Sequence, residues 1–108
     1  MPQMSDWDDL AVRVGTVVRA EPNEAARDAA YSLWIDFGEI GELQSSAKIT
    51  DLYLPGQLVG RQVVAVTGFE PMRVGGFRSD VLVVGATTAE GIVLLQVDRP
   101  VPPGSVVA

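Results

Sequence analysis

Hydrophobic and polar residues alternate with a period of two along much of the chain, which is typical of β-strands that turn one face toward a core. The clearest run covers residues 31–37, and its apolar side consists of Tyr31, Leu33, Ile35 and Phe37. Residues 12–21 alternate in the same way, and one face of that run consists of Val12, Val14, Thr16, Val18 and Ala20. Both stretches therefore predict half-buried strands.

Turn residues divide the rest of the chain into further short elements. Residues 22–29 are predicted to be a surface connection, and residues 50–60, around Pro55-Gly56, favour a short helical turn at one end of a barrel. Residues 91–97 are nearly all apolar and predict a buried strand. The other expected elements are a turn at 38–41, a polar strand at 42–49, valine-rich strands at 62–69 and 80–86, and a loop at 70–79 between those two.

Both ends differ from this pattern. Ser5 is a good N-cap for one helical turn over residues 6–10. The final segment, DRPVPPGSVVA at 98–108, has three prolines and a glycine that exclude a regular element before Ser105. The length of 108 residues fits one domain. We therefore predict a single all-β domain over 1–108, with a barrel or sandwich core at about 12–97 and extensions at 1–11 and 98–108.

The composition removes most catalytic chemistry. The chain has no cysteine and no histidine, so it lacks disulfides, thiolate and imidazole metal ligands, and the commonest general base. No pair of carboxylates carries a glycosidase or metal motif. No apolar run approaches the roughly 20 residues that span a bilayer, and the first ten residues include three aspartates. We expect a cytoplasmic binding protein that is not an enzyme, with no cofactor, no metal and no membrane insertion.

Charge is distributed unevenly along the chain. The net charge of −6 is unusual for a nucleic-acid-binding protein, because lysine and arginine supply most of the affinity for phosphates. Residues 1–42 hold nine acidic and three basic residues, whereas residues 43–108 hold five of each. Residues 61–79 hold three arginines and one acid. A polyanion site, if present, is therefore expected in the second part of the chain.

Five stretches together resemble the CsaA family of export chaperones, which lies within the wider group of tRNA-binding domains. They are VRVGTVV at 12–18, LWIDFGEIG at 33–41, QSSAKIT at 44–50, FEPMRVGGFRSDVLVVG at 69–85 and VLLQVDRPVPPG at 93–104. The resemblance implies a five-stranded Greek-key barrel of the oligonucleotide-binding (OB) fold, with short helical turns and terminal extensions. It also implies a homodimer formed through those extensions, with tRNA and unfolded or pre-export polypeptides as partners.

The resemblance places a tRNA-binding surface on the polar QSSA strand and the basic loop that follows the next strand. The matching residues are Gln44, Ser45, Ser46, Lys48, Arg73, Phe77, Arg78 and Ser79. Arginines pair with phosphates, hydroxyl and amide groups bond to sugars or base edges, and an aromatic ring stacks on an unpaired base. Two positions depart from the family pattern, since Met72 stands where we expect a lysine and Asp80 where a glutamate is usual.

Other interpretations of these residues stay open at this stage. The two serines could be the solvated face of a hairpin strand, and Phe77 could anchor the loop in the core instead of offering a stacking surface. The two loop arginines could be ordinary exposed charges.

A peptide-binding chaperone with little tRNA binding is the alternative function. Its apolar contact residues would be Trp34, Phe69, Met72 and Phe77. The tail is expected to support a dimer, because Val101, Val106 and Val107 have little to pack against within a small barrel.

Overall fold

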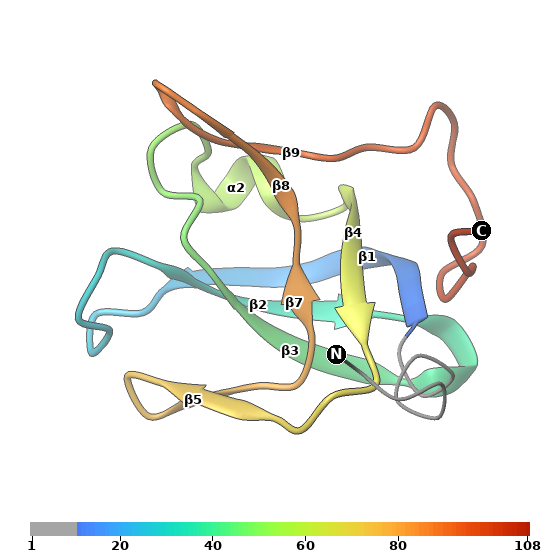
Figure 1. Ribbon diagram of the computed structural model, residues 1–108, viewed down its shortest axis with the longest axis horizontal. Helices are drawn as coiled ribbons and strands as arrows, with labels where there is room; N and C mark the ends of the chain where they lie inside the picture. Colours follow the sequence, from blue (N-terminus) through green and yellow to red (C-terminus); the bar gives the residue numbers. More distant parts are fainter. Residues whose placement is uncertain (1–10) are drawn as a thin grey trace, which may run out of the picture.

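The computed structural model describes residues 11–108, which form a small β-barrel (Figure 1). Its main sheet has five antiparallel strands in the order β3-β2-β1-β4-β7. Their bounds are Ala11–Pro22 for β1, Tyr31–Asp36 for β2, Glu42–Ala47 for β3, Gln62–Thr67 for β4 and Leu82–Val83 for β7. The edge strands β3 and β7 meet where the Val83 N–H donates to Ser45 Oγ at 3.4 Å, so the sheet nearly closes. The predicted all-β OB-fold is confirmed.

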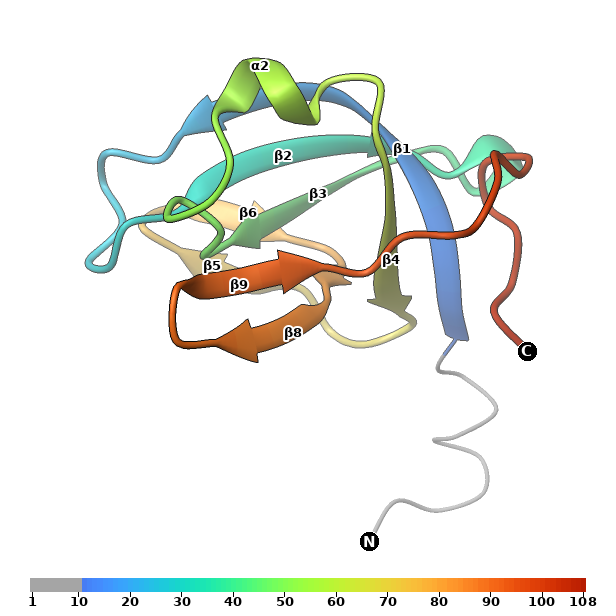
Figure 2. The same cartoon turned by 90° about the horizontal axis from the view of Figure 1, so that it is seen from above.

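Two small ribbons and two helical turns complete the fold. β5 (Met72–Val74) pairs with β6 (Phe77–Ser79), and β8 (Gly85–Thr88) pairs with β9 (Gly91–Leu94). The 3-10 helix η1 (Gly38–Ile40) joins β2 to β3. The short helix α2 (Pro55–Leu58) lies over one end of the barrel (Figure 2), where the helical turn was predicted.

The core is centred on β2. Leu33, Ile35 and Phe37 are 0% exposed and Tyr31 is buried beside them, so the predicted alternation of this strand is confirmed. They belong to one apolar cluster that also includes Leu58 of α2. Burial of large apolar side chains is the main favourable term in folding, and this cluster therefore fixes the barrel on which the surface residues are mounted.

The predicted faces of β1 hold for only part of the strand, because it contains an irregularity. Its pairing with β2 shifts register between Val17 and Arg19, and such a bulge reverses which residues point inward. At the bulge Val17 faces the core and Val18 is exposed, against the prediction, whereas Ala20 beyond it packs against the core as predicted. Gly15 also faces inward, since a Cβ there would lie 2.5 Å from Ile35 Cγ2.

Three other sequence predictions need correction. Residues 70–79 are not an irregular loop, because β5 and β6 form an antiparallel hairpin within them. The strand expected at 80–86 is divided into β7 and β8. The strand expected to be buried at 91–97 pairs only with β8, so that Leu94 is buried whereas Val93 and Leu95 are exposed.

The C-terminal tail docks on its own barrel along the part of β1 that β2 does not reach. The backbone hydrogen bonds run from Gly104 N to Val14 O (2.7 Å), from Val14 N to Ser105 O (2.9 Å) and from Val107 N to Val12 O (2.7 Å). The side chains of Val106 and Val107 nevertheless stay exposed. The helical turn predicted over residues 6–10 lies outside the described residues. No helix in residues 11–108 is long and apolar enough to cross a membrane.

Candidate nucleic-acid interface

The β5–β6 hairpin presents two arginines on one face. Arg73 and Arg78 are direct partners in the antiparallel register, and both are exposed. Residues that are directly opposite in an antiparallel pair project to the same side, and like charges in that position are destabilising. A bound anion would relieve this repulsion. The hairpin therefore presents two exposed cationic groups on one face.

Asp80 partly offsets this charge and connects the hairpin to the sheet. Its carboxylate lies 2.7 Å from Arg78 Nε and also accepts the Gln44 N–H at 3.0 Å. The Gln44 side chain donates in turn from Nε2 to the Arg78 carbonyl oxygen at 2.9 Å. Arg73 donates to the carbonyl oxygen of Gly76 and forms no ion pair with residues 11–108. The Asp80 carboxylate thus orients Arg78 and offsets its charge, whereas no carboxylate of residues 11–108 offsets the charge of Arg73.

Two of the predicted contact residues are structural in this fold. Ser45 is 0% exposed and Ser79 is 1% exposed. The Ser79 hydroxyl donates to Val81 O at 2.9 Å and accepts the Ser46 N–H at 3.1 Å. The Ser45 hydroxyl donates to the carbonyl oxygen of Ser46 and accepts from β7. Neither hydroxyl faces solvent, because both join β3 to the segment that closes the barrel. The solvated-face interpretation is therefore wrong for Ser45.

Ser46 and Lys48 lie further along β3 and beyond its end, on the outward side. Ser46 is half-buried and Lys48 is exposed. Lys48 Nζ lies 3.0 Å from Asp28 Oδ2, and both side chains are well exposed. Exposed ion pairs of this kind contribute little to stability, so Lys48 can exchange its partner for a phosphate at small cost.

Aromatic residues and an arginine from β1 extend this surface across the sheet. The rings of Trp34 and Phe77 meet edge to face, with 5.4 Å between their centroids. Arg19 Cζ lies 4.3 Å from the centroid of the Trp34 ring. Phe77 is outside the core cluster, so the alternative interpretation of this residue as a core anchor is wrong. Sequence reasoning missed Arg19, because the bulge in β1 gives no signal in the alternation pattern.

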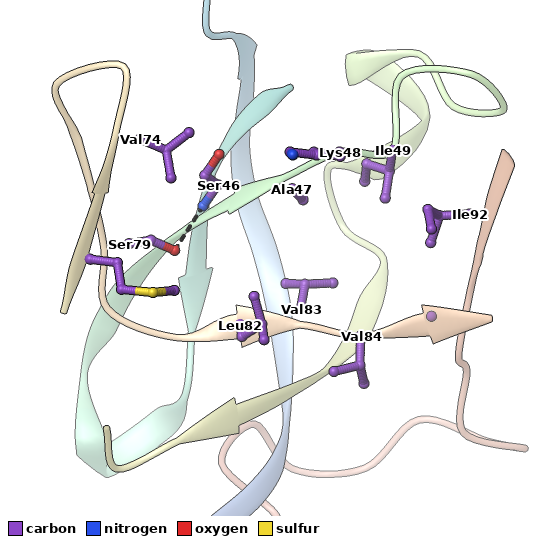
Figure 3. Close-up of a pocket in the computed structure, with 12 residues that line it drawn as sticks. Ser46, Ala47, Lys48, Ile49, Val74, Ser79, Leu82, Val83, Val84 and Ile92 are labelled. Carbon is purple, nitrogen blue, oxygen red and sulfur yellow. Dashed lines mark hydrogen bonds between the residues drawn. The ribbon is translucent and has the colours of Figure 1, made fainter. Parts of the chain in front are cut away.

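A separate apolar pocket of about 380 Å³ opens where the barrel is incompletely closed. Figure 3 shows side chains from β3, the hairpin, β7 and β9 around it. Its apolar lining includes Ile49, Met72, Val74, Leu82, Val83 and Ile92, with Ser46 and Lys48 also contributing. Of the four predicted peptide contacts, only Met72 lines this pocket. Trp34 and Phe77 contact each other instead, and Phe69 is half-buried outside the lining.

Comparisons with known proteins agree with this fold. A family model described as a putative tRNA binding domain matches residues 12–106. The solved structure of chaperone CsaA from Bacillus anthracis str. Ames is 47% identical with a TM-score of 0.88, and the match covers 100% of this chain and 99% of that one. The CsaA chaperone from Picrophilus torridus is 37% identical with a TM-score of 0.89, with 100% of both chains covered.

The sequence is also similar to one part of a much longer enzyme. The methionine–tRNA ligase of Methanothrix thermoacetophila is 40% identical over 95 residues, which make up 88% of this chain but only 14% of the ligase. The matching family is described as a binding domain and the full-length neighbours as chaperones, which confirms that the chain is a binding protein and not an enzyme. The chain belongs to the putative tRNA-binding domain family, and it is similar over its full length to CsaA chaperones.

Proposed function

We propose that this protein binds tRNA through the face formed by the β5–β6 hairpin and the outward side of β3. The observation that carries the proposal is the exposed cross-strand pair of Arg73 and Arg78. Two like charges held opposite each other favour an anionic ligand between or above them. Gln44, Ser46 and Lys48 lie beside them and offer amide, hydroxyl and ammonium groups to the RNA backbone or base edges.

The proposed contact surface carries only a small excess of positive charge. Asp80 pairs with Arg78 and Asp28 pairs with Lys48, and the whole chain has a net charge of −6. Few counterions would therefore be released on binding, which lowers the nonspecific part of the affinity. Recognition would then depend on the shape of the RNA and on its unpaired bases.

A salt titration of tRNA binding by the purified protein tests this proposal. Affinity should be highest at low salt and should fall linearly on a plot of log affinity against log salt. A fluorescently labelled tRNA and anisotropy readings would give the slope. No binding at low ionic strength would refute the proposal.

A second candidate function is peptide binding in the apolar pocket, as expected of a chaperone. The specific observation in its favour is the open pocket of about 380 Å³, beside which Met72 and Leu82 expose much of their surface. Exposed apolar surface of this kind suits the side chains of an unfolded polypeptide. Methionine adapts to varied partners because its thioether side chain is flexible.

Replacing Leu82 with glutamate should abolish this second activity, since a carboxylate would enter the apolar pocket. We expect the variant to lose its ability to suppress aggregation of a reduced, unfolding client at stoichiometric amounts, measured by light scattering. Val59→Glu is the matched control, because Val59 is an exposed apolar residue that does not line the pocket. Equal suppression by both variants would count against the pocket, as would steep salt sensitivity, because apolar contacts respond weakly to screening.

We further propose a cytoplasmic role in protein export, as for a chaperone that binds polypeptides. We also propose that the protein forms a homodimer through its C-terminal tail. The tail is held by backbone bonds while Val106 keeps 60% of its surface exposed. A rigid segment of this kind loses little entropy on docking. Val106→Asp should shift the protein from dimer to monomer in sedimentation at micromolar concentration. Val93→Asp, at an exposed position of β9, should leave the dimer intact. A monomeric wild-type mass would refute the dimer.

A further inference from the structure

We propose that Arg19, stacked on Trp34, is a binding site for an unpaired nucleobase. The inference rests on the proposed RNA-binding function and extends it to a residue on β1 that belongs to neither the hairpin nor β3. The ligand class is a flat aromatic base in a single-stranded part of an RNA.

The guanidinium of Arg19 already has two partners within the protein, the Glu21 carboxylate and the Trp34 ring. Its Nε and Nη2 atoms donate to Glu21 Oε1 at 2.9 Å and 2.6 Å. The same group lies over the Trp34 ring, with Cζ 4.3 Å from the ring centroid. One side of the guanidinium is thus covered by the indole, whereas the Arg19 side chain as a whole is 60% exposed. The other side of the guanidinium offers a flat surface to a ligand.

The surroundings of Arg19 favour a base over a phosphate. The carboxylate of Glu21 uses two of the guanidinium N–H groups and cancels its net charge. A phosphate would be repelled by that carboxylate and would compete with it for the same donors. A neutral base needs only the flat face, and bases stack well on the planes of arginine and aromatic side chains. This position is therefore suited to a base.

The stacked pair is continuous with the proposed RNA surface. Trp34 is paired in register with Gln44 on β3 and with Arg19 on β1. Phe77 of the hairpin contacts the Trp34 ring, and Gln44 bonds to the backbone of Arg78. β1 and β3 are two strand spacings apart, about 10 Å. An RNA strand whose phosphates lie at the hairpin would reach Arg19 within a few nucleotides.

Substitution of Arg19 with lysine separates planarity from charge, since lysine keeps the positive charge and lacks the flat group. The probes are an oligoadenylate of about eight nucleotides and an abasic oligomer of the same length. Binding of each probe to the full chain is measured. We expect Arg19→Lys to weaken oligoadenylate binding roughly 5- to 100-fold, as for loss of one stacked base. The salt slope should be unchanged, and the abasic oligomer should bind the variant and the wild type equally.

Arg27→Lys is the matched control, because Arg27 is an exposed arginine in the loop between β1 and β2. It should leave both affinities unchanged. Trp34 supplies a second readout in a Trp7→Phe background, where it is the remaining tryptophan of the chain. Its emission should change when oligoadenylate is added, but not when the abasic oligomer is added.

Three results would overturn the inference. The first is that Arg19→Lys changes the affinity for oligoadenylate less than twofold. The second is that Arg19→Lys weakens binding of the abasic oligomer as much as binding of oligoadenylate. The third is that the wild type does not bind oligoadenylate at low salt. Salt-sensitive tRNA binding together with any of these leaves the proposed function standing without the base site. Oligoadenylate binding that depends on Arg19, found together with no tRNA binding, would support the base site and refute the proposed function.

Discussion

Replacing both Arg73 and Arg78 with alanine is expected to lower tRNA affinity at least about tenfold, because each arginine contributes a charge-assisted hydrogen bond to phosphate. The slope of log affinity against log salt should fall by about 2, one for each lost phosphate contact. The two side chains are exposed and stand opposite each other in the hairpin. Their removal relieves like-charge repulsion but also removes the ion pair between Arg78 and Asp80, so the two effects oppose each other and stability should change little. Anisotropy titrations at several salt concentrations would measure both quantities.

The control for this variant must match its change in net charge. Arg27→Ala combined with Arg99→Ala removes two exposed arginines from a loop and from the tail. This double variant should bind tRNA nearly as well as the wild type. If both double variants weaken binding equally, the attraction comes from the overall charge of the protein, and the hairpin is not the contact site.

Replacing Phe37 with alanine is expected to lower the free energy of unfolding by about 3–5 kcal/mol, the usual cost of removing a buried phenylalanine. The ring is 0% exposed and belongs to the core cluster. It also lies against Gly15, since a Cβ at Gly15 would be 2.8 Å from its Cε1. The backbone of Phe37 lies beside Gly104 of the tail. The cavity would therefore weaken both the core and the support for the tail. Urea denaturation followed by circular dichroism would measure the loss.

Val59→Ala is a suitable control for Phe37→Ala, because Val59 is a large apolar residue that is exposed. Its effect should stay within about 0.5 kcal/mol, as for most surface substitutions. A loss below about 1 kcal/mol for Phe37→Ala would show that the core tolerates the cavity, and would contradict the central role of β2. Domains of this size have a total stability of roughly 5–15 kcal/mol, so the expected loss is a large part of the whole.

The alternation of apolar and polar residues correctly predicted the elements whose apolar side chains all pack into one core. The Tyr31–Phe37 run is the best case, because its apolar residues all pack into one cluster. The same rule failed on β1, where a register shift after Val17 changes which residues point inward. It failed again at residues 91–97, because a two-stranded ribbon buries only part of an apolar run. Bulges and ribbon positions depend on tertiary pairing, which a period in the sequence does not encode.

The candidate site was predictable to a similar degree. The hairpin arginines could be found from a local excess of charge, and the structure places them together. The buried state of Ser45 and Ser79 could not be found in this way, because it results from barrel closure between segments more than thirty residues apart. Arg19 was missed for another reason, since its place opposite Trp34 depends on the bulge in β1.

The position of the docked tail bears on how such a domain is joined to other proteins. The Val107 N–H bonds to Val12 O, so both ends of the described barrel lie side by side at the start of β1 (Figure 2). Arg19 is seven residues further along the same strand, roughly 24 Å away at the usual rise of a β-strand. The backbone at Val107 thus lies away from the proposed base site. Further sequence can therefore follow the tail without covering Arg19, an arrangement that suits a domain similar to a small part of a far longer ligase.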